Sequence, residues 1–574
     1  MKQIRGERLS RIGFIVAAAL AGSLACAPAR AEDFQLVDVS IAAPLGVYRA
    51  KTIEVSSSPL TRDAAQKLLS ATTPGAGEDK FAQLDAQRIF IPELVATSTA
   101  GDYEQTAVYR NVALTKVAKG VAETIDVAGA DLSAKRAGVV NRGVVGAIHG
   151  EGVDFPALLR ITTGARAKAD EPKKITTRKI NVASVEIEVD GGGKLTIGAI
   201  EGSDFGGRAL AVPLAGLVEA APRAGGPEPS PAARRALAAM VGDMLTSLDV
   251  GSLDMRDIAT AMPGADKGRT EAVNFRRIGL SRLIDGKIGN FSIEGIVAGK
   301  DDTKLEIERI DLAGLDIRET LAAAASADPK PAAPRFDRLE IAGLAMAIPE
   351  GPVSLARAVV EARDWLEIAP TKLSARFERA VVSLAGAGAA RNAPLAALGY
   401  DKLDLSGALE AKYDSQKGEL TLDKLEADGA GMGTARLALM LSRVPAAIFS
   451  GDAQAAQLAL PAITFWRADI GLTDRGLLSR YARARAKDER KTEAQIRSEF
   501  AAMGVLMTRT LFSAQPNANP AVEAVANAVS AFAKGAPNLD IRAHAPDGMG
   551  LLDLSLAAQM GSLAERLKID AKAH

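Results

Sequence analysis

The feature that most constrains the fold of this sequence is a spacing of apolar residues that recurs along most of its length. Two apolar residues stand two positions apart, two small or polar residues follow, and a third apolar residue comes next. The pattern occurs at Val112/Leu114/Val117, Ile180/Val182/Val185, Leu195/Ile197/Ile200, Phe291/Ile293/Ile296, Leu305/Ile307/Ile310, Leu339/Ile341/Leu344 and Leu420/Leu422/Leu425. Chance gives about three or four copies. The modest excess supports repeated strands rather than a defined repeat family.

Each copy of this pattern describes a strand that changes its geometry part of the way along. The step of two places the first two apolar side chains on one face, because successive side chains alternate between faces. The step of three moves the third side chain to the other face unless a bulge or bend intervenes. We therefore expect a mainly β (α+β) protein: a long twisted antiparallel or solenoid-like sheet of short strands, with a helical insert in the C-terminal third.

Helical spacing is confined to a few segments. Pro231 stands at the expected first turn of a helix over 232–248, whose apolar residues share one face. Similar spacing within 474–534 predicts a helical insert that packs on or beside the strands. For 492–512 the alternative is a helix that seeks a membrane surface, although its charges are mixed in sign and its apolar face lacks Trp.

The N-terminus has the three parts of a secretory signal peptide. Four basic residues precede the apolar run 12–21, and a stretch of small residues ends in Ala-Arg-Ala at 29–31. The run is shorter than the roughly 20 residues that a membrane anchor needs, so we expect cleavage after Ala31. Cys26 does not predict lipidation, because Ser23 stands where lipoprotein boxes carry Leu.

Charge and cysteine content exclude several classes of protein. The chain has 70 Lys+Arg and 70 Asp+Glu, and loss of residues 1–31 would remove five positive charges and one negative charge, which gives a net charge of −4. A mildly acidic chain without basic clusters lacks the electrostatic footprint of nucleic-acid binding. Without Cys26 there is no thiol for a disulfide, a metal or catalysis. No later apolar run reaches spanning length, so we expect a soluble periplasmic protein with no nucleic-acid partner and no transmembrane span after cleavage.

Composition also divides the chain into regions, because clusters of Pro, Gly and Ala interrupt the periodic segments. The expected regions are a signal peptide at 1–31, a β-rich N-terminal region at 32–217, a linker at 218–231, a helix plus β-rich middle region at 232–326, a linker at 327–334, a β-rich region at 335–473, a helical insert at 474–534 and C-terminal strands at 535–574.

No motif identifies a catalytic, cofactor or metal site. The three histidines, His149, His544 and His574, are scattered, so a zinc hydrolase is not expected. His149 lies in the Gly-rich segment 143–152, which could be a loop that carries a general base, although a strand end or turn is favoured. His544 follows strand-like residues and is expected to be partly buried. We assign no catalytic residue, no cofactor and no metal, and the ligand-binding residues stay unknown.

Two glycine clusters resemble ligand-binding loops only superficially. The segment 429–433 lacks the spacing and the Lys-Ser/Thr of a phosphate loop, and 190–193 joins two strand-like segments. Both are expected to be hairpin turns. Trp365 and Trp466 are the only tryptophans, and this scarcity disfavours recognition by stacking on sugars or single-stranded nucleic acid. Trp466 could line a pocket, but a core position is favoured.

The texture of short strands and small apolar residues from Phe34 onward resembles AsmA-like and YdgA-like envelope proteins of Gram-negative bacteria. The segments that carry the likeness are 88–94, 400–407 and 468–478. The resemblance spans most of the mature chain and implies β-sheet grooves that handle lipids or support the envelope, with no catalytic residues to carry over. AsmA-like proteins usually keep an N-terminal membrane anchor, and the cleavable signal expected here departs from that pattern.

We therefore expect a non-enzymatic exported envelope protein that binds a lipid or other amphiphile along an apolar sheet face, because apolar area is its main resource for recognition. The first alternative is a periplasmic scaffold that presents sheet edges to an envelope protein. The second is a hydrolase with an unrecognised site. A continuous apolar face favours binding of an amphiphile, an unpaired edge favours the scaffold, and a pocket that joins His149 or His544 to a carboxylate favours the hydrolase.

Overall fold

The computed structural model describes most of the chain after the expected signal peptide. The described residues are 31–43, 46–69, 77–100, 103–136, 139–168, 170–190, 192–212, 230–263, 270–300, 303–328, 331–349, 351–384, 393–512 and 519–574. Residues 1–30 of the expected signal peptide and most of the expected linker at 218–231 lie outside these ranges. Strands make up 57% and helices 26% of the structure, which confirms the expected mainly β fold.

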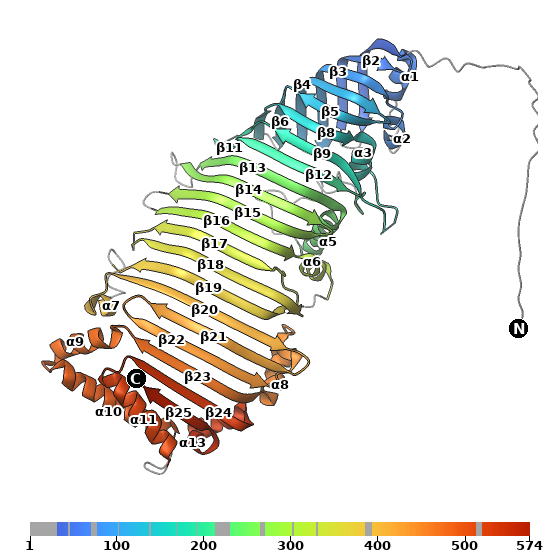
Figure 1. Ribbon diagram of the computed structural model, residues 1–574. Helices are drawn as coiled ribbons and strands as arrows, with labels where there is room; N and C mark the ends of the chain where they lie inside the picture. Colours follow the sequence, from blue (N-terminus) through green and yellow to red (C-terminus); the bar gives the residue numbers. More distant parts are fainter. Residues whose placement is uncertain are drawn as a thin grey trace, which may run out of the picture.

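The strands form one antiparallel sheet of 25 strands (Figure 1). They are β1 (Glu32–Ala43), β2 (Gly46–Ser58), β3 (Ala86–Ala100), β4 (Tyr103–Ala118), β5 (Val121–Val127), β6 (Gly129–Arg136), β7 (Val139–Val145), β8 (Ile148–Asp154), β9 (Lys174–Val182), β10 (Val185–Val189), β11 (Gly193–Ile197), β12 (Ala199–Gly207), β13 (Leu248–Pro263), β14 (Thr270–Ile284), β15 (Lys287–Lys300), β16 (Thr303–Asp316), β17 (Arg338–Ala347), β18 (Val353–Leu366), β19 (Ala369–Ser383), β20 (Lys402–Asp414), β21 (Glu419–Gly429), β22 (Gly433–Ser442), β23 (Thr464–Asp474), β24 (Asn538–Gly550) and β25 (Lys568–Ala573).

The helices are shorter and gather toward the C-terminus. They are α1 (Arg62–Leu69), α2 (Gly77–Phe81), α3 (Phe155–Thr163), α5 (Pro231–Ser247), α6 (Arg318–Ala325), α7 (Ala393–Ala397), α8 (Ala453–Ala459), α9 (Leu477–Glu489), α10 (Glu493–Phe512), α11 (Pro520–Lys534), α12 (Leu551–Gln559) and α13 (Leu563–Arg566), with the 3-10 turns η1 (Ala446–Phe449) and η2 (Leu460–Ala462).

Strand pairing follows the order of the chain. From β13 onward each strand pairs with the strand before it and the strand after it. Between β4 and β13 the long strands are broken near the middle. Thus β5 and β6, β7 and β8, β9 and β10, and β11 and β12 each supply the two halves of one strand. The sheet is therefore a single up-and-down meander that forms through contacts between chain neighbours.

The copies of the apolar spacing mark the places where these strands bend or break. Lys116, Gly295 and Gly343 lie inside the three-residue step of their copies and have φ values of 44°, 64° and 63°. The copy in β16 has its step opposite Gly343. Two other steps separate β9 from β10 and β11 from β12, and the step in β21 coincides with a register shift. The expected bulge or bend is therefore confirmed: the steps fall at bends with positive φ, at breaks between half-strands or, in β21, at a register shift.

In β4 the bend at Lys116 keeps Val117, the third apolar residue of the copy, on the same face as Val112 and Leu114. Val112, Leu114 and Val117 all belong to one buried cluster, which also contains residues of β1, β2, β3 and α1. Without the positive φ at Lys116, the step of three would turn Val117 to the opposite face. The spacing therefore encodes a strand that keeps a single apolar face on both sides of a bend.

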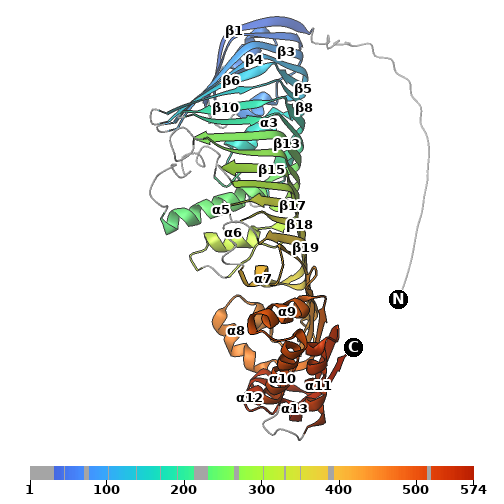
Figure 2. The ribbon, with the colours of Figure 1, turned by 90° about the vertical axis from the view of Figure 1, so that its left-hand side faces the viewer.

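The helices lie on one side of the sheet. Figure 2 shows the sheet from its edge, with α5, α6, α7, α8 and the C-terminal helices projecting to the same side. At the N-terminal end, Phe81 of α2 and Phe155 of α3 pack on the buried cluster that contains β1–β4. We call this side of the sheet the helix side.

The expected helices at 232–248 and within 474–534 are confirmed as α5 and as α9, α10 and α11. The region 535–574 was expected to contain strands, but only β24 and β25 are strands, and α12 and α13 lie between them. The two strands agree with the expectation, but the helices were not expected, because α12 reads as alternating Leu and polar residues, whereas Leu551, Leu554 and Ala557 pack together on one helical face. The short helices α1, α3, α6 and α8 were also not expected.

Substitution of Gly343 tests the role of the bends. Its φ of 63° lies in the left-handed region, and an added Cβ would stand 2.6 Å from the Cβ of Glu308. We expect Gly343→Ala to lower the free energy of unfolding, measured in urea, by about 1–3 kcal/mol. Gly242→Ala is the control, because an added Cβ in α5 meets nothing closer than 3.7 Å and should stabilise by up to about 1 kcal/mol. Equal changes in the free energy of unfolding for Gly343→Ala and Gly242→Ala would contradict the role assigned to the bend.

Candidate functional site

A row of apolar residues runs directly across the whole sheet on its helix side. Each member lies opposite the next in the strand register, so all of them face the same side. We call this the central row: Phe34, Val55, Ile89, Leu114, Ile125, Gly150, Ile180, Gly202, Leu253, Leu280, Phe291, Leu312, Leu339, Val360, Ala375, Leu409, Leu425, Leu437, Ile470, Ile541 and Ala571. No member has a polar side chain.

A second row runs beside the central row. On each strand its member lies two residues from the member of the central row, alternately after it and before it along the chain. It contains Val127, Ile148, Val182, Ile200, Met255, Ile278, Ile293, Ile310, Ile341, Ala358, Phe377, Gly407, Ala427, Ala435, Leu472, Leu539 and Ala573. Because neighbouring strands lie about 4.8 Å apart, the two rows form an apolar face about 100 Å long. We call it the apolar face.

The apolar face is covered at its N-terminal end and open farther along. In the central row, Ile89 and Leu114 are 4% and 8% exposed beneath the N-terminal helices, whereas Leu425 and Ile470 are 42% and 41% exposed. Phe377 of the second row is 38% exposed. The same row therefore changes from core to surface. Sequence reasoning anticipated an apolar sheet face but could not tell whether it was open or packed.

The covered end encloses a cavity of about 400 Å3. Helices α1, α2 and α3 close it over β1–β5, and its lining is almost entirely apolar: Val39, Ile41, Tyr48, Ala50, Ile53, Leu69, Phe81, Leu84, Ile89, Ile91, Leu94, Val112, Leu114, Ile125, Phe155, Leu158, Leu159, Thr162 and Thr163. A volume of this size falls within the usual range of ligand pockets, about 300–1,000 Å3. Leu158 is 38% exposed and lies at the surface of this region.

The polar groups of the cavity lining are few. The hydroxyls of Thr162 and Thr163 donate hydrogen bonds to backbone carbonyls of their own helix, Leu158 and Leu159 among them, so neither is left to select a ligand. Burial raises the pKa of Tyr48 above its ordinary value, so its hydroxyl stays protonated and can donate. The cavity is therefore suited to an apolar chain, with one hydroxyl as its polar group.

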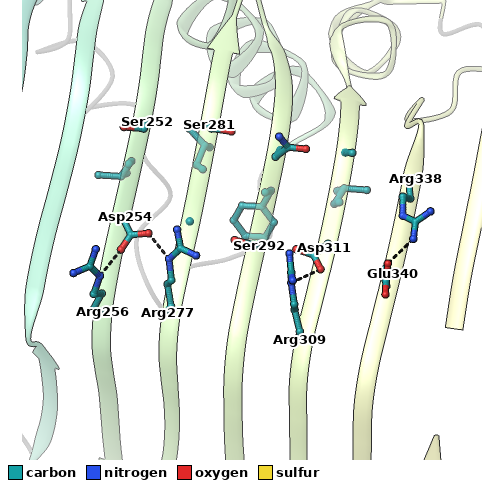
Figure 3. A pocket seen from close by; sticks show the side chains of 17 residues that line it. Ser252, Asp254, Arg256, Arg277, Ser281, Ser292, Arg309, Asp311, Arg338 and Glu340 are labelled. Atoms are coloured by element: carbon teal, nitrogen blue, oxygen red, sulfur yellow. Dashed lines mark hydrogen bonds and ion pairs between the residues drawn. The ribbon is translucent and has the colours of Figure 1, made fainter. Parts of the chain in front are cut away.

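The opposite face of the sheet carries the charged residues, which pair with one another. Figure 3 shows a depression of about 580 Å3 there, where small residues of β13–β17 lie among arginines and carboxylates. Asp254 accepts from Arg256 and Arg277, Arg309 pairs with Asp311, and Arg338 with Glu340. Because each of these four arginines has a carboxylate partner, the depression offers no unpaired charge for an anionic ligand.

His149 lies in β8 beside two carboxylates. Its Nδ1 is 2.7 Å from Oδ1 of Asp126, and its Nε2 is 3.6 Å from Oε1 of Glu151. His149 and Asp126 border a depression of about 540 Å3 at the break between the half-strands, whose lining includes Asn181 and Glu201 but no Ser, Thr, Cys, Lys or Arg. Asp126 could orient His149 as a base, yet this lining supplies no hydroxyl or thiol nucleophile and no cationic group to stabilise an oxyanion.

The other residues singled out by sequence have structural positions. His544 was expected to be partly buried, but it is exposed opposite Arg467 and Lys568, because it stands three residues after Ile541 and so turns away from the helix side. His574 lies at the C-terminal end of β25, with Nδ1 3.8 Å from Asp540.

The tryptophans and glycine clusters serve the fold. The indole N–H groups of Trp365 and Trp466 donate to the Phe336 carbonyl and the Ser442 hydroxyl. The cluster at 429–433 is the turn between β21 and β22, and 190–193 joins β10 to β11, so both expected hairpins are confirmed.

Within the described part of the chain, no three His, Cys, Asp or Glu side chains gather in an arrangement that could hold a metal ion. None of its helices combines the length and apolar character required to cross a membrane.

Comparisons with known proteins give little guidance. Residues 426–574 match a family model that is described only as an uncharacterized protein. No curated protein and no solved structure matches the chain. The matched segment begins in β21 and contains α8–α13, so it covers the C-terminal end of the sheet together with its helices.

Glu340 allows the pairing on the charged face to be tested. Arg357 and Arg338 donate to its carboxylate at 2.7 and 2.6 Å and lower its pKa from 4.5 to about 2. Because this pKa is lowered in the folded state, its contribution to stability is present above pH 4.5 and is lost as the pH falls toward about 2. We expect wild type to exceed Glu340→Gln in free energy of unfolding by about 1–2 kcal/mol at pH 6 and the difference to shrink toward pH 2. A difference independent of pH would contradict this pairing.

Proposed function

We propose that this protein binds lipids or other amphiphiles along its apolar face and has no catalytic role. The observation that carries the proposal is the central row, which presents apolar side chains across every long strand and is at least partly exposed from Leu253 onward. Soluble proteins rarely leave contiguous apolar surfaces of more than a few hundred Å2 uncovered, and those that do use them for binding. No member of the two rows is charged, and the charged strand residues of the other face pair with one another, so apolar area is the main means of recognition on this face.

The geometry favours extended apolar chains over compact ligands. The open face is one side of a sheet about 100 Å long, and at its N-terminal end the same face lines a cavity that can hold an apolar chain. Apolar burial contributes about 25 cal/mol per Å2, so contact with part of one acyl chain supplies several kcal/mol. The resemblance to AsmA-like and YdgA-like envelope proteins supports the same class of ligand.

We also propose export to the periplasm, on the basis of the N-terminal succession of basic, apolar and small residues. Cleavage after Ala31 would leave β1 beginning at the first residue of the mature chain, Glu32. N-terminal sequencing of the protein from the periplasmic fraction is expected to begin Glu-Asp-Phe. Retention of Met1, or a lipid on Cys26, would show that the signal is not cleaved in this way.

A protein-interaction scaffold is the second candidate, and the edge strand β1 favours it. This strand has 12 residues and pairs only with β2 among the described residues, so its outer edge can accept another strand. The opposite edge, β25, has only six residues, among them Lys568 and Lys572. Short, lysine-bearing edges resist pairing, so β1 is the edge on which this candidate depends.

Lipid extraction tests the first candidate. Mass spectrometry of natively purified protein is expected to detect phospholipid or fatty acid in amounts well above those of a periplasmic protein purified in parallel. The double variant Leu425→Lys/Ile470→Lys places charge on the open part of the central row and should lower the bound lipid severalfold. Both residues are more than one third exposed, so the variant is expected to fold.

Ala408→Lys is the matched control for this experiment. It adds the same side chain on the charged face, where Ala408 lies between Arg376 and Glu426, and it should leave the bound lipid unchanged. Leu158 lines the cavity, so Leu158→Lys should lower the amount of lipid held in the cavity and leave the lipid held on the open face unchanged. Absence of lipid from the wild type, or equal loss in the Ala408→Lys control, would eliminate amphiphile binding and leave the scaffold.

A further inference from the structure

Large apolar side chains are exposed on the C-terminal helices α10 and α12. Among the described residues, four of the five most exposed large apolar side chains lie on α10, on α12 or directly after α12: Met507, Leu506, Leu552 and Met560, at 67, 66, 60 and 58%. Met503 and Leu556 of the same two helices are 54 and 53% exposed. Scattered surface leucines need no explanation, but such a concentration marks an interaction surface.

These side chains form stripes along two neighbouring helices. Met503, Leu506 and Met507 are spaced three and four apart on α10, and Leu552, Leu556 and Met560 are spaced four apart along and just after α12. Helical residues at these spacings share one face, and α10 contacts α12. We call the two stripes together the C-terminal patch.

The opposite faces of these helices are already occupied by the core. Ile496, Ala501 and Thr508 of α10 are buried, and Leu551, Leu554 and Ala557 of α12 pack in the cluster that also holds Val522 and Val525 of α11. Arg509 of α10 donates two hydrogen bonds of 3.0 Å to Glu523 of α11. The patch is therefore the outer side of a rigid helical layer, and its exposure does not come from a loose helix.

A local excess of positive charge lies in the helix that precedes α10 and packs on its N-terminal half. Residues 475–491, which contain α9, include seven Lys and Arg but only Asp488 and Glu489 as acidic residues, and α9 packs against α10. Several of these cations have partners, as Arg485 has in Glu489. Lys487 and Arg490 are exposed and have no ion-pair partner among the residues that the structure describes.

We propose that the C-terminal patch docks on the surface of a lipid bilayer that contains anionic headgroups. Its leucines and methionines would enter the boundary between headgroups and acyl chains, while Lys487 and Arg490 of the adjacent segment contact the headgroups. The combination of aliphatic stripes with exposed cations that have no ion-pair partner among the described residues fits a lipid surface with anionic headgroups.

Vesicle binding by the purified full chain tests this proposal. The wild type is expected to co-sediment with vesicles of mixed phosphatidylglycerol and phosphatidylcholine, and more weakly with phosphatidylcholine alone. Leu506→Ser/Met507→Ser should weaken binding to the mixed vesicles by about tenfold or more, because each buried Leu or Met contributes about 1.5–3 kcal/mol. Lys487→Gln/Arg490→Asn should weaken it about fivefold per residue, and only on vesicles with phosphatidylglycerol. Asn is chosen because Arg490 has φ 54°, which Asn tolerates.

Two matched variants separate this surface from the rest of the molecule. Ile175→Ser removes a side chain of β9 that is 56% exposed and should bind vesicles as the wild type does. Leu425→Lys/Ile470→Lys changes the open apolar face and should also bind vesicles normally, so failure of docking is distinguishable from failure of amphiphile binding.

Three outcomes would overturn bilayer docking. The wild type could fail to bind either kind of vesicle, or Leu506→Ser/Met507→Ser could bind as well as the wild type. In the third, light scattering would show a dimer of the wild type that the same serine substitutions dissociate, which would make a second copy of this chain the occupant of the patch.

Discussion

Register between neighbouring strands is the constraint on which the rest of this structure depends. A slip of one residue in any strand would move its whole apolar set to the charged face. The central row passes from Phe291 to Leu312 to Leu339 without such a slip. Because each strand from β13 onward pairs with its chain neighbours, each hairpin there aligns the next strand, and the half-strands before β13 pair with partners close in the chain, so no distant contact is needed to keep a face about 100 Å long in alignment.

The bends of successive strands lie on one line across the sheet. Positive φ values occur at Asp257, Gly295, Gly343 and Arg379, on β13, β15, β17 and β19, and register places these residues in one line across the sheet through intervening residues of β14, β16 and β18. A line of irregular residues bends all of these strands at the same height, so they remain paired on both sides of it. Glycine at two of the positions relieves the strain that a side chain incurs there.

The sequence revealed this bend but not the surface that the sheet presents. The step from Ile341 to Leu344 predicted the irregularity at Gly343 because a bend in a strand is encoded within a few neighbouring residues. The central row could not be predicted in the same way, since it arises from pairing between strands. The covered cavity was missed because α1 and α3 are short and their helical spacing is weak.

The C-terminal helices show a different limit of sequence reasoning. The segment 492–512 was expected to pack in the core, with a surface-seeking helix as the alternative. Its helix α10 is apolar on both sides, so periodicity alone did not identify which side the neighbouring helices would cover. Ile496 is 1% exposed and Leu506 66% exposed within the same helix. The balanced charge of the whole chain likewise concealed the basic segment around α9, because acidic residues elsewhere offset it.

The composition of the two rows sets how an amphiphile would travel on the proposed apolar face. Neighbouring positions of the central row differ little in polarity, so an acyl chain that leaves one for the next loses and gains similar apolar contact. Gly150 and Gly202 are the exceptions, since they supply no side chain between the covered cavity and the open strands. The second row compensates there with Ile148 and Ile200. Apolar contact therefore narrows to one row at this point without being broken, which makes the cavity a distinct compartment of a continuous face.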